Sequence, residues 1–222
     1  IQVLGLTYTR RTQVKSSNKT SALIVGNPAM PSVGEPPEPL TPLPYAEQEA
    51  IAIANILNTK PVLGRQATEE TITRQLANAR LIHFATHGLL DDLGGMEVPG
   101  ALALTPTQTT DGLLSSNEIL NLSLPAAELV VLSACDTGRG KITGDGVIGL
   151  SRSFILAGAP SVVVSLWAVP DDATAVLMTE LYRNLQNGNK AQALRQAMLT
   201  TMERYPNSRD WAAFTLIGEA EF

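Results

Sequence analysis

The sequence predicts an α/β fold in which a mostly parallel central sheet is flanked by helices on both faces. Short apolar runs of strand type alternate with amphipathic helical patterns from end to end. The runs at 129–134 and 161–169 are continuously apolar, as expected for parallel strands buried on both faces. The chain has 222 residues, of which 44% are hydrophobic, so it can bury a large core.

Strands are predicted where apolar residues run together and a turn residue ends the run. The first run, 22–26, is closed by Gly-Asn-Pro, and another, 81–88, is closed by Gly88. The predicted strands are 22–26, 61–64, 81–88, 100–104, 129–134, 161–169 and 211–217.

Helices are predicted where apolar residues recur every three or four positions, often behind a capping side chain. Thr68 can cap one such helix, Ser115 or Ser116 a second, and Asp171 or Asp172 a third. The predicted helices are 45–57, 69–77, 115–122, 147–157, 171–185 and 190–204. Residues 31–44 hold six prolines in fourteen positions and are therefore predicted to be an extended surface loop.

Composition argues against several classes of partner. The net charge is -5 and no basic cluster exceeds Arg10-Arg11, so no nucleic-acid partner is expected. The apolar runs are far shorter than the roughly 20 residues that span a bilayer, so no membrane partner is expected. A single cysteine cannot form an internal disulfide and suits a cytoplasmic location. Because the chain starts at Ile1 without Met, we expect it to be part of a longer protein.

Two chemically active side chains follow predicted strands. His87 ends the strand LIHFATHG, and Cys135 ends the strand LVVLSAC. In an open parallel sheet the ligand site lies at the carboxyl ends of the strands, so the two side chains can meet if their strands are neighbours. A thiol with an ordinary pKa of about 8.5 needs such a base to form thiolate at neutral pH. The alternative is that Cys135 is a small buried residue and that His87 is a structural histidine. His83 lies in the middle of its strand and is predicted to pack in the core.

A rival motif lies downstream of the cysteine. Gly144, Gly146 and Gly149 satisfy the G-x-G-x-x-G pattern of dinucleotide-binding enzymes. That pattern requires its first glycine directly after the strand, whereas eight residues, 136–143, intervene here. A nucleotide-binding enzyme is therefore the lesser alternative.

The motifs together resemble the CHAT domains, caspase-like modules related to separases and often fused to tetratricopeptide repeats. His87 precedes Cys135 by 48 residues, similar to the His-to-Cys spacing of about 50 in caspases. The resemblance covers about residues 22–217. It is carried by FATHG, GALAL, LLSSNEI, LVVLSACDTG, GDGVIGLSRSFILAGAPSVVVSLWAVPD and the final WAAF.

The resemblance implies a caspase-like three-layer sandwich, a single domain over 1–222, and a cysteine endopeptidase that acts on protein substrates. Cys135 would be the nucleophile and His87 its base. The backbone N–H groups of Gly88 and Cys135 would form the oxyanion hole. The resemblance implies no cofactor and no metal, and it suggests tetratricopeptide repeats or other regulatory domains as partners.

Five residues are candidates for the pocket beside the cleaved bond. Ser133 stands where caspases carry a glutamine, which argues against cleavage after Asp. Acidic residues in the predicted loops that follow the strand ends favour a basic (Arg or Lys) substrate residue. Trp167 either walls the pocket or simply packs, and Asp145 and Asp171 have a turn and a helix cap as alternative roles. The candidates are Ser133, Asp136, Asp145, Trp167 and Asp171. A catalytically silent interaction module of the same fold is the main alternative function.

Overall fold

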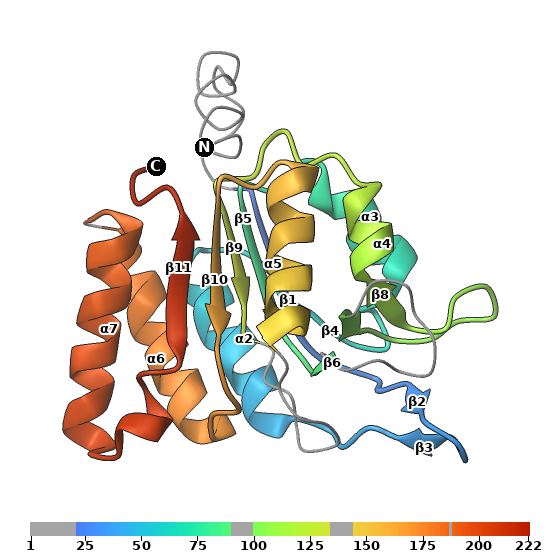
Figure 1. The fold of residues 1–222 in the computed structure, drawn as a ribbon, viewed down its shortest axis with the longest axis horizontal. Helices are drawn as coiled ribbons and strands as arrows, with labels where there is room; N and C mark the ends of the chain where they lie inside the picture. The colour runs from blue at the N-terminus through green and yellow to red at the C-terminus, as the bar shows by residue number, and fades with distance from the viewer. Residues whose placement is uncertain (1–20, 90–99, 134–143, 187) are drawn as a thin grey trace.

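A computed structural model describes residues 21–89, 100–133, 144–186 and 188–222 (Figure 1). A six-stranded sheet forms its centre, and every neighbouring pair in it is parallel except β10 with β11. In spatial order the strands are β11 (Phe214–Gly218), β10 (Ser161–Ser165), β9 (Leu129–Leu132), β5 (Leu81–Ala85), β1 (Ala22–Pro28) and β4 (Val62–Gly64). The predicted mostly parallel sheet is confirmed.

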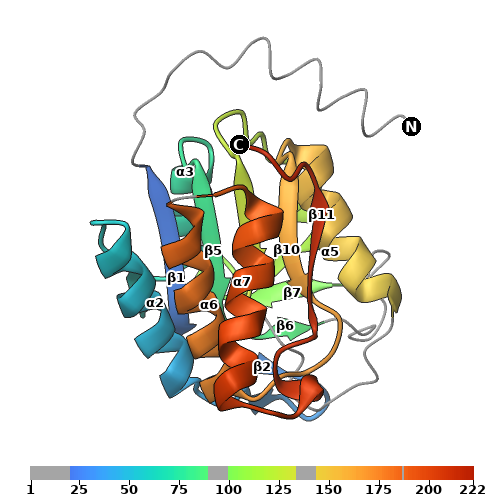
Figure 2. The same cartoon turned by 90° about the vertical axis from the view of Figure 1, so that its left-hand side faces the viewer.

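Helices cover both faces of this sheet (Figures 1 and 2). One face carries α3 (Glu69–Leu76), α4 (Ser116–Leu120) and α5 (Gly144–Ala157), and the other carries α2 (Pro44–Ile56), α6 (Asp171–Leu185) and α7 (Lys190–Arg204). A short 3-10 helix, Ser208–Asp210, precedes β11. Each face therefore has its own apolar core, as expected for strands that are hydrophobic on both sides.

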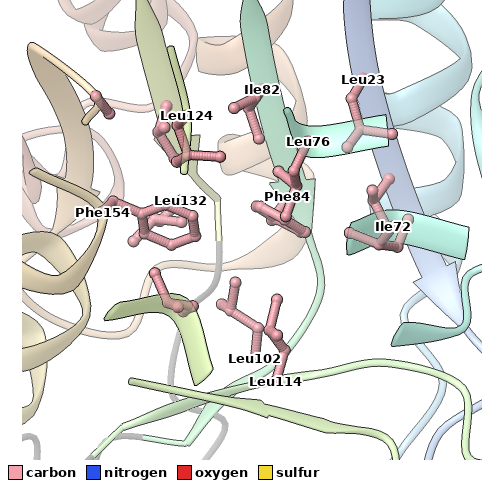
Figure 3. Packing of buried hydrophobic residues seen from close by; sticks show 14 of the residues in the cluster. Leu23, Ile72, Leu76, Ile82, Phe84, Leu102, Leu114, Leu124, Leu132 and Phe154 are labelled. Carbon is pink, nitrogen blue, oxygen red and sulfur yellow. The ribbon is translucent and has the colours of Figure 1, made fainter. Parts of the chain in front are cut away.

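The core on the α3 and α5 face is built from large aliphatic and aromatic side chains (Figure 3). Phe84 from β5 and Phe154 from α5 lie with ring centroids 6.0 Å apart and are fully buried. Ile72 and Leu76 reach the same cluster from α3. β5, β9 and β10 are buried at every position, which explains why apolar residues predominate in their sequences.

Two of the predicted helix caps are confirmed. Thr68 Oγ1 accepts the Thr71 N–H at 3.2 Å at the start of α3. Ser115 and Glu118 form a reciprocal capping box at the start of α4.

The predicted cap of α6 is wrong. Pro170 occupies the cap position and offers no side-chain hydrogen bond, while Asp171 is the first helical residue. The Asp171 carboxylate instead accepts a hydrogen bond from the Tyr45 backbone on α2.

Several boundaries differ from the predicted ones, including those of α5, β10 and β11. α5 begins at Gly144 and not at Val147, because glycine carries no apolar signal although it is tolerated in the first helical turn. β10 ends at Ser165 and not at 169, because its partner β9 ends at Leu132, which lies opposite Val164. β11 begins at Phe214, three residues later than predicted.

The proline-rich segment and the predicted 100–104 strand both form small antiparallel pairings outside the central sheet. β2 (Ser32–Val33) and β3 (Glu38–Pro39) pair within the predicted loop, across a turn that contains Gly34 at φ +88°. The predicted strand forms β7 (Ala101–Ala103), which lies between β6 (Gly88–Leu89) and β8 (Leu113–Ser115). Such short, local pairings leave little periodic signal in a sequence.

In the part of the chain that the structure describes, no helix combines the length and the apolar character that crossing a membrane requires.

Helix α2 lies unusually close to β1 at Gly26. A Cβ built on Gly26 would stand 2.8 Å from the Ala46 carbonyl oxygen and would overlap the Ala50 side chain. Only glycine allows this approach, which holds the start of α2 against the edge of the sheet where β1 ends.

We predict that Gly26→Ala lowers the free energy of unfolding by about 1–3 kcal/mol, because α2 must move away from β1 to admit the methyl group. Urea denaturation measures this change. Gly188→Ala is the matched control, since a Cβ there would meet no atom closer than 3.6 Å. Equal stability of the two variants would contradict the close approach.

Candidate active site

The two strands that lead to His87 and Cys135 are direct neighbours. β5 and β9 pair in parallel, with Phe84 opposite Leu132 near the carboxyl end of each strand. His87 lies two residues beyond β5. Ser133 directly follows β9, whereas Cys135 and Asp136 fall outside the described residues. The strands that precede His87 and Cys135 are therefore neighbours, which is the condition predicted from the sequence for the imidazole and the thiol to meet.

The His87 ring is held by a backbone carbonyl. His87 is 1% exposed, and its Nε2 lies 2.6 Å from the Thr41 carbonyl oxygen. A carbonyl oxygen can only accept, so Nε2 carries the hydrogen and, in the neutral ring, Nδ1 carries the lone pair. Burial lowers the pKa of His87 below its ordinary value of 6.5, and the bond to Thr41 partly opposes this shift. Near pH 7 the side chain is therefore a neutral imidazole whose basic nitrogen is Nδ1.

Thr41 belongs to the proline-rich segment, and no sequence pattern predicted its role. Two hydrogen bonds hold this segment in place: Leu40 N–H to the Pro31 carbonyl at 3.0 Å, and Leu43 N–H to Asn27 Oδ1 at 2.8 Å. The segment is therefore a fixed support for the imidazole as well as a connection to α2.

The Gly88 N–H is directed away from strand β7. Gly88 lies opposite Leu102, and the bond between these two strands runs from Ala103 N–H to the His87 carbonyl at 2.9 Å. In an antiparallel ladder this pattern makes Gly88 and Leu102 a non-hydrogen-bonded pair. The Gly88 N–H thus points to the side of β6 opposite β7.

Two of the predicted pocket residues have well-defined surroundings. Ser133 is buried, and its hydroxyl has no hydrogen-bond partner among the described residues. Trp167 is half-buried two residues beyond β10, where its indole N–H donates to the Arg209 carbonyl at 2.9 Å and its ring packs against the α6 and α7 core. Packing of Trp167 is thus observed, and its role as a pocket wall stays a prediction.

The two acidic candidates that the structure describes are not in loops, contrary to the sequence prediction. Asp145 is the second residue of α5, and Asp171 is the first residue of α6. Both places suit a carboxylate, because the first turn of a helix exposes N–H groups and the positive end of its dipole.

The Asp171 carboxyl group has a strongly perturbed proton affinity. Its pKa is raised from 3.8 to about 6, first by burial and then by the negative charge of Glu49, with a smaller contribution from Asp172. The hydrogen bond from the Tyr45 backbone opposes the shift. Tyr45 follows Thr41 by only four residues, so one short stretch of chain supports both His87 and Asp171.

His83 and Glu49 form a buried pair in the core, of which only His83 was identified from the sequence. His83 Nε2 and Glu49 Oε1 are 2.8 Å apart, and the two side chains are 0% and 1% exposed. The Tyr182 ring meets the His83 ring edge-on at a centroid distance of 5.4 Å. The predicted core position of His83 is confirmed. Glu49 could have been found, since it lies three residues after Ala46 and four before Ile53, on the apolar face of the helix.

Within the described ranges, no group of three or more His, Cys, Asp or Glu side chains is placed to hold a metal ion.

Comparison with known proteins identifies the family. The sequence matches the CHAT domain over residues 3–219. The chain belongs to the CHAT domain family. Tetratricopeptide repeat protein 28 of mouse is 32% identical over 237 residues, and that of human is 33% identical over 238 residues. Each match covers 91% of the CHAT domain chain and 10% of the relative, so the chain spans about a tenth of these proteins.

Solved structures share the fold of the CHAT domain at low sequence identity. The Arg specific cysteine proteinase gingipain R superposes with a TM-score of 0.66 at 13% identity, covering 98% of this chain and 52% of its own. Separase from the Saccharomyces cerevisiae separase–securin complex superposes with a TM-score of 0.61 at 18% identity. The match covers 97% of this chain and 13% of the separase chain. The predicted caspase-like α/β fold is confirmed by these matches.

We predict that the His87 imidazole titrates with a midpoint below 6.5, because its burial disfavours the charged form. Proton NMR of the two histidine rings during a pH titration measures this midpoint. The spectrum of His87→Ala assigns the signal. A midpoint above 6.5 would contradict the buried, neutral imidazole.

Replacing Asp171 by Asn should raise the melting temperature more at pH 7.5 than at pH 5. The folded-state pKa of about 6 exceeds the ordinary value of 3.8, so Asp171 costs no stability below pH 3.8, and the cost grows as the pH rises until it is complete above pH 6. Solvent screening of this half-exposed group leaves a cost of about 1 kcal/mol, equivalent to about 2–4 °C. Thermal unfolding at both pH values tests this, with Glu203→Gln, which removes an exposed carboxylate on α7, as the control. A larger gain at pH 5 would contradict the raised pKa.

Proposed function

We propose that the CHAT domain is a cysteine endopeptidase that uses Cys135 as nucleophile and His87 as base and cleaves after a basic residue. The observation that carries the proposal is the state of His87. It is buried, its tautomer is fixed by the Thr41 carbonyl, and it follows the strand adjacent to the one that leads to Cys135. A reducing cytoplasm would keep the single thiol in its reactive form.

The reaction divides between these two side chains. His87 Nδ1 takes the Cys135 thiol proton as the sulfur attacks the scissile carbonyl, and His87 then gives that proton to the leaving amine. The product is a thioester between Cys135 and the acyl part of the substrate. A water molecule, deprotonated by His87, then releases the acid and regenerates the thiol.

The oxyanion of each tetrahedral intermediate requires backbone donors. The outward direction of the Gly88 N–H supports its assignment as one donor, with the Cys135 N–H as the other. Glycine at this position allows a substrate carbonyl to approach the backbone. One such donor typically contributes about 3–4 kcal/mol to the transition state.

Preference for a basic residue is supported by Asp171. This half-buried carboxylate lies after β10, at the same edge of the sheet as His87, and no described Lys or Arg pairs with it. Gingipain R, which shares the fold, is described as Arg specific. Ser133, Asp136, Asp145 and Trp167 complete the proposed pocket.

A catalytically silent interaction module is the second candidate. The curated relatives are named for their tetratricopeptide repeats and not for a protease activity, and the solved separase is bound to securin. On this reading the domain would bind partner proteins, including repeat or regulatory domains, without cleaving them.

Fluorogenic peptides that differ only in the residue before the dye separate the two candidates. We expect cleavage after Arg or Lys to exceed cleavage after Asp or Leu by at least about tenfold, because an acidic pocket attracts a cation and repels a carboxylate. Cys135→Ala and His87→Ala should each reduce the rate by about a hundredfold or more.

Thr41→Ala is the matched control, since it keeps the backbone carbonyl that holds His87 and should retain activity. No cleavage of any peptide by the intact chain, with a thiol that also resists peptidyl electrophiles, would favour the interaction module. Equal cleavage after Arg and Asp would exclude the acidic pocket.

A further inference from the structure

We propose that Glu49 is a specificity-determining residue of the CHAT domain: its buried carboxylate, fixed behind Asp171 by His83, sets how strongly Asp171 holds a cationic side chain and rejects an acidic one. This inference rests on the proposed function, because it takes Asp171 as the residue that receives the basic substrate side chain.

Helix α2 packs against helix α6 (Figure 2). Tyr45 and Glu49 are four residues apart on α2, so they lie on the same face of the helix. The Tyr45 backbone bonds to the Asp171 carboxylate at the start of α6, so Asp171 lies beside the first turn of α2, and Glu49 follows in the next turn of that helix. Glu49 is 2% exposed and thus lies on the core side of this pair, while Asp171 lies on the solvent side.

His83 fixes the Glu49 carboxylate in the core. A buried carboxylate is costly unless it is hydrogen-bonded, and the imidazole of His83 supplies that bond at 2.8 Å. The residues around Glu49 on α2 are small and apolar: Ala46, Ala50, Ile53 and Ala54. Packing alone therefore does not explain a glutamate at this position, because burying its carboxylate costs free energy. Its charge acts on the neighbouring titratable groups.

That effect is the mutual repulsion of two carboxylates. Two nearby carboxylates disfavour the ionised state of each other, and Glu49 is the largest charged contributor to the raised pKa of Asp171. The other titratable groups that face this pair are Asp172 on α6, Tyr182 on α6 and His83 on β5. Only His83 is basic among them, and its bond is already made to Glu49.

A cation that enters the pocket relieves this repulsion. An arginine or lysine side chain beside Asp171 would gain from both carboxylates, whereas a substrate carboxylate would be repelled by both. Because Asp171 is partly protonated near pH 6, the cation would also displace a proton. Binding should therefore weaken as the pH falls, and Glu49 should determine over which pH range this occurs.

The first test needs no ligand. Carboxyl carbon NMR of the 222-residue chain should give an Asp171 midpoint near 6, and Glu49→Gln should move it toward 3.8. Glutamine can keep the hydrogen bond to His83 while it removes the charge. Glu47→Gln is the matched control, because it removes the same charge two residues away on α2 and should leave the midpoint unchanged. The Asp171→Asn spectrum assigns the signal.

The second test uses benzamidine, a monocation that resembles the arginine side chain, in calorimetric titrations. With an Asp171 midpoint near 6, binding to the unmodified chain should be about fourfold weaker at pH 5.5 than at pH 7.5. In Glu49→Gln the same ratio should fall below about twofold. Glu47→Gln should keep the fourfold ratio, since any effect of His87 protonation is common to all three proteins.

The outcomes separate the two proposals. An Asp171 midpoint that stays near 6 in Glu49→Gln overturns the role of Glu49, whatever the chain cleaves. A midpoint that moves while the benzamidine ratio stays fourfold overturns the specificity role. Failure of the unmodified chain both to bind benzamidine and to cleave any peptide overturns the proposed function, and the ligand-free midpoint still reports whether Glu49 acts on Asp171.

A further variant guards against misfolding. If Glu49→Gln does not fold, the double variant Glu49→Leu with His83→Leu removes both members of the pair, so that neither is left buried without a partner. The same drop in the Asp171 midpoint is expected, and its absence overturns the inference.

Discussion

The parallel pairing of β5 with β9 is the constraint on which the site depends. These strands occupy the middle of the central sheet, are buried at every position and end at the same edge. Since their register places Phe84 opposite Leu132, the residues that follow the two strands begin side by side. A slip of one residue would turn every side chain of either strand to the opposite face, so the two apolar cores also fix this register.

Much of the fold could be predicted because its signals are local. Continuous apolar runs identified the central strands, and side-chain caps identified the starts of α3 and α4. The start of α6 at Asp171 was predicted correctly, but the role of its carboxylate as a cap was not, because that carboxylate bonds to α2, at a residue 126 positions earlier in the chain. Long-range hydrogen bonds of this kind leave no periodic pattern in a single sequence.

The same distinction applies to the site. His87 was identifiable from its place after an apolar strand, whereas the Thr41 carbonyl was not, because every residue has an equivalent backbone carbonyl group. Glu49 is an intermediate case. Its helical spacing could have indicated burial, but that spacing could not show that His83 is its partner or that its charge raises the pKa of Asp171.

The length of the proline-rich segment affects whether His87 is held in place. Its backbone, and not any particular side chain, holds the imidazole through Thr41. A deletion or insertion between β3 and α2 would therefore release the His87 ring even though every residue that names the family stayed in place. Among related chains, the presence of the histidine and cysteine would then not show whether the histidine ring is held in place. The length of this segment would be the better indicator.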